Sequence, residues 1–474
     1  MQTALVGIDI GTTNIKLSAY NEQGEQLREC SCRNEILYQN GMADFDGKDI
    51  FCKVISMLRS VVEQGLYIRS IGISSLAESV FPLFGGESGD PGRTMVWFDK
   101  RTEGVMHEFL DSIGSGQFSR ITGLKPNYLY SIHKIHWYHR HVEETREARL
   151  WLPMNSYIVY RLTGGLGMDY SQASRTGALD ITRRTWSEEI FRHLPFDAEV
   201  FPSLVDCGVA IGELTDEVKR QLGIDYDVPV SLAGHDHICG SFTVAAFRDD
   251  VILDSMGTAE NISTMIDLNE IRLDEFMAEG IHLGAHVVPE KYYVYKAFDF
   301  SGAVLNQVAS LLLSKPVVEV SGDDYSLLCL EAEPYFGQDP GTLRVFMSED
   351  NHLAQGYPPG LNILGVGPTT TRGEVFMAAI RHVSDKACQV IRSLDRVLGK
   401  HHSVIAIGGG TRNHLLMKDK ARNLNRSLFV PQITDAVTLG GALMGAVGAG
   451  IFSGHAEAIQ AITRNEYEVT VPSS

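Results

Sequence analysis

The sequence predicts an α/β protein built from two domains. Its 474 residues are more than one ordinary hydrophobic core accommodates, so two domains are the default expectation. Apolar strands alternate with amphipathic helices along the chain. The strand–turn–strand segment at 7–20 also resembles the one at 251–266, since both carry small residues at the turn. This repeat indicates two related domains that face a common cleft, which we place at 1–245 and 246–474.

The tip of the first hairpin, GIDIGTTNIK, carries a carboxylate, a glycine and two hydroxyls. Gly11 lets the backbone approach a phosphate, and the hydroxyls of Thr12 and Thr13 can donate to phosphate oxygens. Asp9 stands at the strand end, where a Mg²⁺ ion would be held. A plain hairpin turn is the alternative interpretation of so short a string.

A second carboxylate, Asp236, stands between an apolar strand at 228–233 and the small residues that begin a helix at 239–241. Free backbone amides and the helix dipole favour anionic groups at such a position, which suits a catalytic carboxylate beside a phosphate. The alternative is that Asp236 only caps the helix.

Further strands and helices are predicted around these two carboxylates. We expect a third strand at 26–34, an amphipathic helix at 50–62 with Asp46 near its N-cap, and a buried strand at 68–76. Another strand is expected to end at 96–99. The residues that follow these strands are candidates for ligand contact, because the carboxyl ends of strands face ligands in α/β sheets.

Residues 131–163 are predicted to be helical and bring together His133, His136, His139 and His141. A metal site is one interpretation of this histidine run. Lysine and arginine residues occur in the same run, however, and zinc needs ligands that converge. A solvated helix face is therefore the favoured interpretation.

In the second half, residues 246–250 are interpreted as a surface connection at the domain boundary. Residues 321–371 are expected to be irregular and to contain no clear site. Two strands and then two helices are expected at 251–255, 262–266, 300–313 and 374–398.

The segment 404–425 combines a strand, a triple glycine and a helix whose start carries Asn413. Such a unit can admit the flat face of a nucleotide against its backbone. It matches neither the Rossmann nor the P-loop pattern, so neither type of site is indicated. The Gly- and Ala-rich residues 434–450 predict a structural helix that packs closely against a neighbouring element.

Composition excludes several classes of function. The net charge of −18 argues against nucleic acid or an anionic membrane as the main partner, since both need basic surface. The seven cysteines are scattered and odd in number, which favours free buried thiols in a reducing cytoplasm. No signal peptide or membrane span is evident, and we expect a cytoplasmic protein.

Several motifs occur in the order found in the FGGY carbohydrate kinases: GIDIGTTNIK, YRLTG with MDYSQASRT, AGHDHICG, SMGT, and GGGTRN with PQITDAVTLGGALMGAVGAG. The chain resembles this family over essentially its whole length. The resemblance implies two domains of the actin-like ATPase (ribonuclease H-like) fold, hinged around a central cleft. It also implies transfer of phosphate from MgATP to a hydroxyl of a sugar or polyol.

The resemblance also implies roles for single residues. Asp9 resembles the acid that holds Mg²⁺ near the phosphates of ATP, and Asp236 resembles the catalytic base. The residues expected around ATP are Gly11, Thr12, Thr13 and Lys16 in a first phosphate loop, Gly257 and Thr258 in a second, Gly302 and Asn306 near the phosphates and ribose, and Gly409, Gly410 and Asn413 at adenosine.

Departures from the family pattern bear on the substrate. Xylulokinases have a histidine near the position of Glu78, which instead resembles the glutamate of glycerol kinase. The expected pocket holds Glu78, Trp97, Asp236 and Asn261, with no obvious cationic anchor, although Arg101 could supply a charge. We therefore expect a neutral substrate: a ketopentose such as xylulose or ribulose, a deoxyketose or a short polyol.

Two other functions remain open at this point. A chaperone-like ATPase would use the same nucleotide cleft on a protein partner, and a regulator would bind sugar without catalysis. The presence of both Asp9 and Asp236 favours a kinase. Dimerisation is common in the family, so a homodimer is an expectation here.

Overall fold

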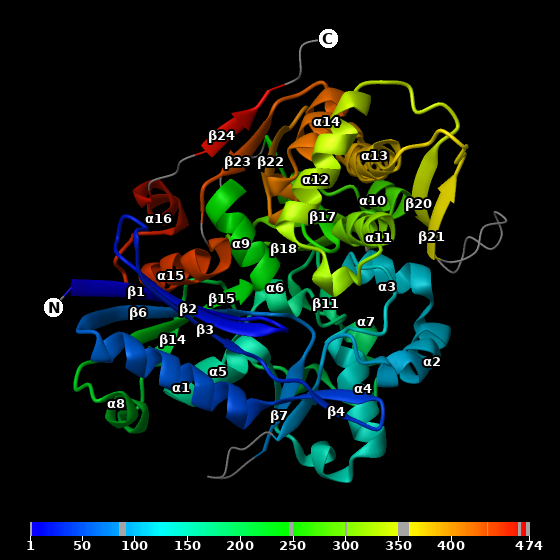
Figure 1. Cartoon of the computed structure of the whole chain (residues 1–474). Coiled ribbons are helices and arrows are strands. Elements are labelled where there is room, and N and C mark those ends of the chain that lie inside the picture. The colour runs from blue at the N-terminus through cyan, green and yellow to red at the C-terminus, as the bar shows by residue number, and fades with distance from the viewer. Residues whose placement is uncertain are drawn as a thin grey trace. The chain divides into compact units, whose positions relative to one another are not determined.

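The structure is a computed structural model that describes residues 2–84, 92–245, 250–298, 301–348, 360–433, 435–462 and 466–470. The chain forms two compact units (Figure 1). Unit 1 comprises residues 1–247, 265–294 and 433–463, and unit 2 comprises 248–264, 295–432 and 464–474. Two segments of the second half therefore pack with the first half. The domain boundary predicted near residue 246 stays a prediction, since residues 246–249 lie outside the described residues.

Unit 1 contains a six-stranded sheet in the order β14-β15-β6-β1-β2-β3. Its strands are β1 (Gln2–Ile10), β2 (Asn14–Tyr20), β3 (Gln26–Arg33), β6 (Leu66–Ser75), β14 (Ala210–Glu213) and β15 (Pro229–His235). The central strands β1, β6 and β15 are parallel, and β2 returns antiparallel to β1. The expected opening hairpin and the third strand are confirmed.

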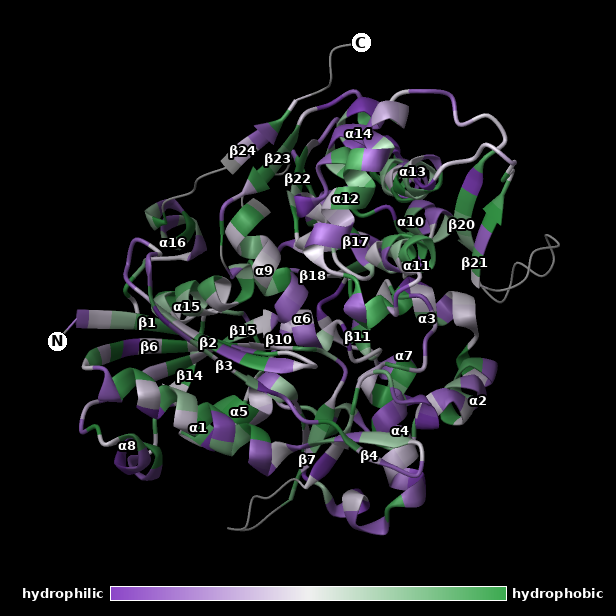
Figure 2. Cartoon of the chain, in the orientation of Figure 1, coloured by the Kyte–Doolittle hydropathy of each residue, from purple (hydrophilic) through white to green (hydrophobic). Residues whose placement is uncertain are grey.

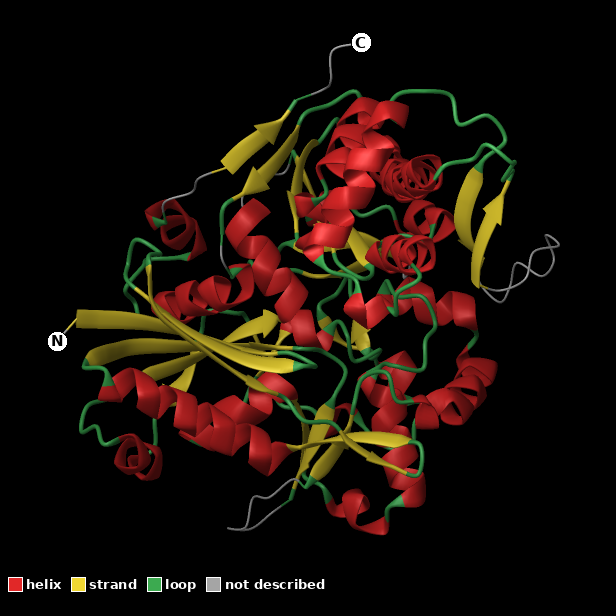
Figure 3. Ribbon diagram, viewed as in Figure 1, coloured by secondary structure: helices red, strands yellow, loops and turns green. Residues whose placement is uncertain are grey.

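Helices cover both faces of this sheet (Figure 3). Those nearest to it are α1 (Gly47–Glu63), α5 (Met154–Thr163), α9 (Asp236–Ala245) and α15 (Ala436–Gly448). The amphipathic helix expected at 50–62 is α1, and the Asp46 side chain caps it by accepting from two backbone amides. In Figure 2, β1, β6 and α15 are mostly hydrophobic, whereas the outer helix α8 (Asp216–Leu222) is hydrophilic.

The Gly- and Ala-rich segment is α15, and it lies directly against the sheet. A Cβ atom on Gly7 would lie 1.7 Å from the carbonyl oxygen of Thr438, and one on Gly72 would lie 1.8 Å from that of Gly441. No side chain larger than hydrogen fits at these two positions of β1 and β6. The predicted close packing of this helix is therefore confirmed.

The prediction that residues 131–163 are helical is confirmed at both ends of this stretch and wrong at residues 150–153, which form a strand. The structure has α4 (Ser131–His141), then β9 (Leu150–Pro153), then α5. β9 pairs antiparallel with β7 (Val80–Leu83), and its apolar residues are mostly buried. Four apolar or ring residues in succession suit a buried strand better than one face of a helix. The other elements of this part are β4 (Leu37–Gln39), β5 (Met42–Asp46), β8 (Arg93–Met95), α2 (Glu103–Ile113) and α3 (Ser115–Thr122).

Unit 2 contains neighbouring strands in the order β17-β16-β22-β23-β24. They are β16 (Val251–Met256), β17 (Glu260–Ile266), β22 (Ser403–Ile407), β23 (Leu428–Pro431) and β24 (Glu466–Val469). β16 is antiparallel to β17 and parallel to β22, which repeats the pattern of β2, β1 and β6. The helices that accompany these strands are α11 (Gly302–Leu313), α13 (Arg372–Leu398) and α14 (His414–Leu424).

The expectation that residues 321–371 are irregular is wrong. This stretch contains α12 (Gly322–Ala332) and a hairpin of β20 (Arg344–Ser348) and β21 (Gly360–Leu364). α12 begins with a capping box in which the side chains of Ser321 and Asp324 bond to each other's backbone amides.

Among the described residues, no helix combines the length and apolarity needed to cross a membrane. All seven cysteines are free, as predicted, but Cys52 is exposed and Cys30 and Cys32 are only partly buried, so the prediction that all the thiols are buried is wrong.

Candidate active site

The residues predicted to carry the chemistry of unit 1 lie at one edge of its sheet. The parallel register places Asp9 of β1 beside Ser74 of β6, and Ser75 beside His235 of β15. Glu78 follows β6, and Asp236 follows β15. Glu78 and Asp236 therefore lie at the same edge of the sheet, and Asp9 lies near this edge as the second-last residue of β1.

The carboxyl group of Asp9 is buried in an electronegative environment. Burial raises its pKa well above the usual range, and the charges of Asp236 and Asp435 raise it further. Lys16 and a 3.5 Å hydrogen bond from the Ser74 hydroxyl oppose that shift. A bound cation would stabilise the Asp9 carboxylate, because it would offset the repulsion from the neighbouring carboxylates. Carboxylate oxygens are ligands that suit Mg²⁺.

The hairpin tip is held in shape by Asn34. Its side chain donates to the Gly11 carbonyl at 2.8 Å, and its backbone amide donates to the Thr13 carbonyl at 2.8 Å. The Thr12 hydroxyl accepts a 3.0 Å hydrogen bond from the indole of Trp97. The tip predicted to contact phosphate is thus joined directly to a residue predicted to contact substrate.

Lys16 lies on β2, where its ammonium forms a 2.8 Å ion pair with Asp435. The hydrogen bond to Asp435 raises the pKa of Lys16. Asp435 also caps α15 by accepting from the amides of Val437 and Thr438. In this structure Lys16 therefore anchors α15, and its contact with phosphate stays a prediction.

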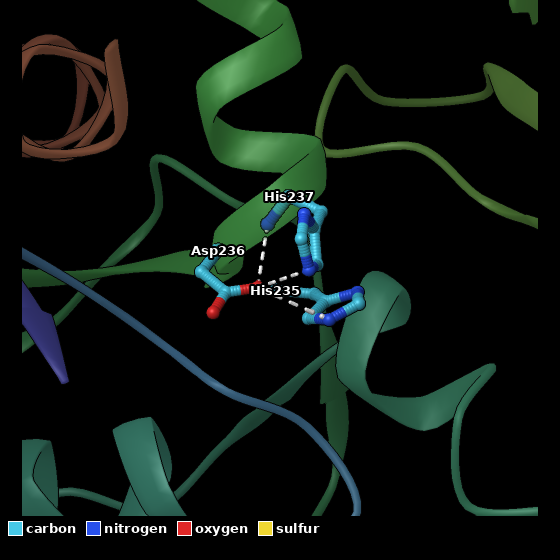
Figure 4. Close-up of side chains that lie close together, drawn as sticks. All are labelled: His235, Asp236 and His237. Carbon is cyan, nitrogen blue, oxygen red and sulfur yellow. Dashed lines mark hydrogen bonds and ion pairs between the residues drawn. The ribbon is translucent and has the colours of Figure 1, made fainter. Parts of the chain in front are cut away.

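Asp236 is the first residue of α9, and two histidines flank it (Figure 4). Its Oδ1 accepts from the His237 amide at 2.6 Å and lies 3.2 Å from Nε2 of His235. Burial raises the pKa of Asp236, and the nearby charge of Glu78 adds to the increase. A carboxylate with a raised pKa is a stronger base than an exposed one, which suits proton removal from a hydroxyl.

Glu78 has a strained backbone and a charged partner. Its φ of 68° lies in the left-handed region, which is unusual for a residue other than glycine. Its Oε1 accepts from Nε and Nη2 of Arg175 at 2.6 and 2.5 Å, and both side chains are buried. The strain and the buried pair fix the position of this carboxylate at the sheet edge.

Arg175 is a residue of unit 1 to which the sequence assigned no role. No obvious cationic anchor was expected among the substrate residues; their contacts with substrate stay a prediction, but beside Glu78 the structure places Arg175. Its charge is matched by Glu78, so the pair offers no net positive charge. Arg101, the other candidate cation, is already paired with Asp44 and Asp99.

The prediction that the histidine run forms a solvated helix face is wrong for His133 and Lys134. His133 and Lys134 of α4 are fully buried, whereas His141 is exposed. The Lys134 ammonium donates to the carbonyls of Leu129 and Trp97, and burial lowers its pKa to about 7. Lys134 thus supports the backbone that carries Trp97.

In unit 2, a second turn packs against the start of a helix. The carbonyl of Gly257 accepts from the Gly302 amide at 3.1 Å, and that of Thr258 accepts from the Ala303 amide at 3.1 Å. A Cβ atom on Gly302 would lie 2.5 Å from the Gly257 carbonyl oxygen. Glycine at residue 302 therefore allows this close approach.

A cavity of about 780 Å³ lies in unit 2, within the size range of small-molecule sites, roughly 300–1,000 Å³. It is lined by all seven residues predicted for the nucleotide in this unit: Gly257, Thr258, Gly302, Asn306, Gly409, Gly410 and Asn413. Tyr325, Ser326 and Cys329 of α12 also line it, and the sequence analysis missed them. The Tyr325 hydroxyl donates to Asn306. Asn261, predicted at the substrate, lies on β17 of unit 2, and its role stays a prediction.

A buried ionic cluster lies next to this cavity. The Lys420 ammonium lies 2.6 Å from Asp254 and 2.6 Å from Glu260, and all three side chains are inaccessible. Burial raises the pKa of Glu260 to about 8, so Glu260 can be protonated and the ammonium then faces a single carboxylate charge. The Ser301 hydroxyl donates to Glu260 at 2.5 Å. The cluster therefore joins α14, β16, β17 and the residue that precedes α11.

Comparisons with known proteins agree with this geometry. The profile of the FGGY family of carbohydrate kinases matches over both parts of the chain: its N-terminal domain at residues 4–243 and its C-terminal domain at residues 275–449. An L-fuculokinase of Haemophilus influenzae is 25% identical over 98% of both chains. A xylulose kinase of Staphylococcus xylosus is 21% identical over 94% of this chain and 90% of its own.

Solved structures show the same fold. A xylulose kinase from Rhodospirillum rubrum has a TM-score of 0.87 at 20% identity, covering 99% of this chain and 94% of its own. A Plasmodium falciparum glycerol kinase with ADP has a TM-score of 0.84 at 17% identity, covering 99% and 95%. The predicted two-domain actin-like ATPase fold is confirmed. The chain belongs to the FGGY family of carbohydrate kinases, which are phosphotransferases.

Proposed function

We propose that this protein transfers the γ-phosphate of MgATP to a hydroxyl of a small neutral sugar or polyol. A ketopentose such as xylulose or ribulose, a deoxyketose or a short polyol would be the acceptor. The observation that carries the proposal is the position of Asp236 at the sheet edge that also holds Asp9 and Glu78. At this edge Asp236 would act as the base, Asp9 would bind a cation, and Glu78 would accept a hydrogen bond from a substrate hydroxyl.

Asp236 would act as the general base. A sugar hydroxyl is a weak nucleophile near neutral pH, and its oxygen attacks more readily as its proton is removed. The raised pKa of Asp236 brings its basicity closer to that task. The 2.6 Å hydrogen bond from the His237 amide holds Oδ1 in a fixed position, which leaves Oδ2 to accept the proton.

The Glu78–Arg175 pair and Trp97 would bind the acceptor. A carboxylate and a guanidinium side by side can accept from one hydroxyl and donate to the next, as vicinal hydroxyls require. Because the pair carries no net charge, it favours a neutral sugar over a sugar acid. The Trp97 indole, held by Thr12, would offer an apolar wall to the carbon chain.

Unit 2 would hold the nucleotide in the cavity between α11, α12 and the triple glycine. Gly409 and Gly410 carry no side chain that would block the base, and the turn at Gly257 and Thr258 would lie at the phosphates. MgATP would supply the phosphoryl group, and Asp9 with the hydroxyls of Thr12 and Thr13 would hold its magnesium ion and phosphates. In phosphoryl transfer the protein contributes mainly positioning and electrostatic stabilisation.

The test measures ADP release with a panel of ketopentoses, deoxyketoses, tetritols, pentitols, glycerol and sugar acids. We expect one neutral compound to raise ADP release well above the rate in water. Asp236→Asn should lower that rate by roughly 10²–10⁴-fold, the usual contribution of a general base. Asp216→Asn, at an exposed carboxylate of α8, is the matched control and should leave it unchanged.

Two results would contradict the proposal. Slow ATP hydrolysis that no sugar stimulates, with or without Asp236, would favour an ATPase that acts on a protein partner. Sugar binding without any ADP release would favour a regulator that lacks catalysis. Membership of a carbohydrate kinase family speaks against both.

A further inference from the structure

Three consecutive side chains at the end of β15 converge on one point (Figure 4). Nε2 of His235 lies 3.2 Å from Oδ1 of Asp236, and Nε2 of His237 lies 4.0 Å from the same oxygen. One potential ligand atom from each residue lies within 4.8 Å of the other two. In the part of the chain that the structure describes, these three residues form a group that could hold a metal ion.

The local backbone explains why neighbours in sequence converge. Gly234 has a φ of 91°, which bends the chain where β15 ends, and α9 begins at Asp236. The His235 amide donates to the Ser171 hydroxyl at 2.9 Å, which fixes the strand end. Side chains of adjacent residues would point to opposite faces in a continuing strand. The bend brings them to one side.

The spacing suits a tetrahedral ion. Ligand atoms that lie about 2.0–2.1 Å from Zn²⁺ stand roughly 3.3 Å from one another in a tetrahedron. The 3.2 Å separation of His235 and Asp236 already meets this value. The His237 atom lies 4.0 Å from Asp236 and within 4.8 Å of His235, so its side chain would have to move toward both. The His237 side chain is 66% exposed, so it is free to move and an ion can enter from solvent.

We propose that His235, Asp236 and His237 form a site for a borderline divalent ion such as Zn²⁺, and that its occupation blocks the kinase. Two imidazole nitrogens and one carboxylate oxygen select Zn²⁺ over Mg²⁺, which prefers oxygen ligands. Three protein ligands leave a fourth position for water or a substrate hydroxyl. The blocking part rests on the proposed function, because it requires Asp236 to be the base.

The inhibition follows from the electron pairs of one carboxylate. The ion takes a lone pair of Oδ1 and draws charge from the whole carboxylate, which then accepts a proton less readily. Coordination of the ion leaves the covalent bonds of the protein intact, so the effect is reversible on removal of the ion. Micromolar Zn²⁺ should therefore inhibit in the presence of millimolar Mg²⁺, and a chelator should restore activity.

The first experiment measures metal binding directly, on the full chain without nucleotide. Co²⁺ replaces Zn²⁺ as a spectroscopic probe, and Zn²⁺ itself is followed by calorimetry. We expect one equivalent to bind, with visible Co²⁺ bands but no thiolate charge-transfer band. His237→Gln, at an exposed position, should weaken binding at least 10-fold. His401→Gln, at an exposed histidine elsewhere, is the matched control and should leave it unchanged.

The second experiment measures Zn²⁺ inhibition of ADP release with the same variants. We expect the inhibitory concentration to rise in His237→Gln in parallel with the dissociation constant. No binding to the native chain below about 100 μM, or equal binding to His237→Gln, would overturn the metal site. Binding at the site without inhibition would overturn the blocking role, whereas the assignment of Asp236 as the base is tested on its own by the ADP-release rate of Asp236→Asn in zinc-free buffer.

Discussion

Both units place buried charges at the end of a central strand, but they balance them differently. In unit 2, Lys420 lies between Asp254 and Glu260, and all three are sealed from solvent. In unit 1, burial and the charges of Asp236 and Asp435 raise the pKa of Asp9, and Lys16 only partly opposes this effect. The balanced cluster depends on its cation, because loss of the lysine would leave buried carboxyl groups without a counter-charge. The unbalanced carboxylates cost stability and are suited to bind a cation and accept a proton.

The largest effect should come from removing the cation of the balanced cluster. Lys420→Met leaves two buried carboxyl groups without their counter-charge, which typically costs about 3–5 kcal/mol of unfolding free energy. Urea denaturation measures this loss. Lys418→Met, at a half-exposed lysine 3.8 Å from Glu333, is the matched control and should change stability by less than about 1 kcal/mol. Similar stabilities for the two variants would show that the cluster does not hold unit 2 together.

The second prediction concerns the buried pair at the sheet edge of unit 1. Glu78→Gln keeps the size of the side chain but removes the charge that Arg175 matches. A hydrogen bond to a charged group contributes about 1.5–3 kcal/mol, so kcat/KM for the sugar should fall roughly 10–150-fold. Glu22→Gln, in an ion pair with Arg69 that is about two-fifths exposed on each side, should have no effect.

The same variant also tests the preference for a neutral acceptor. With Glu78 neutral, Arg175 regains a net positive charge, and sugar acids should improve relative to neutral sugars in ADP-release assays. An unchanged ratio of sugar acid to neutral sugar would mean that this pair does not contact the acceptor.

These residues show where reasoning from sequence reached its limit. Strands and helices with clear periodicity, such as β6, α1 and α13, depend on nearby residues and were predicted within a few positions. The Glu78–Arg175 pair joins residues 97 positions apart, and no local pattern identifies it. α12 was missed because its apolar residues lack a clear helical period, although the S-x-x-D capping box at Ser321 was a readable signal.

The residues of the candidate site also differ in how well the sequence predicts them. Short motifs marked the turns that line the unit 2 cavity, because glycines there reflect a local need for close backbone approach. The burial of His133 and Lys134 depends on what packs around α4, which the sequence of the helix does not reveal.

The third prediction separates activity from stability by their pH dependence. A base must be ionised, so kcat/KM should rise with pH through the raised pKa of Asp236 and fall about tenfold per unit below it. The free energy of unfolding should change with pH in the opposite direction. Between the ordinary and the raised pKa the folded chain binds more protons than the unfolded chain, so unfolding free energy falls as pH rises.

Asp236→Asn tests this opposition in zinc-free buffer. The variant should lose part of the decline in stability with pH, as followed by thermal unfolding. A native chain whose stability rises with pH across that window would contradict the unfavourable burial of these carboxylates.

The smallest effect is expected at Lys16, whose ammonium pairs with the carboxylate of Asp435. Its ion pair with Asp435 is partly exposed, so Lys16→Met should cost less than about 1 kcal/mol in urea denaturation. Asp435 still accepts from the amides of Val437 and Thr438 in that variant, so the cap of α15 survives.

If Lys16 also contacts phosphate, KM for ATP should rise while KM for the sugar stays unchanged. Asp435→Asn removes the same ion pair but leaves the ammonium free, and it should not raise KM for ATP. Equal KM values for ATP in both variants, together with lower stability of Lys16→Met, would assign Lys16 to the anchoring of α15 alone.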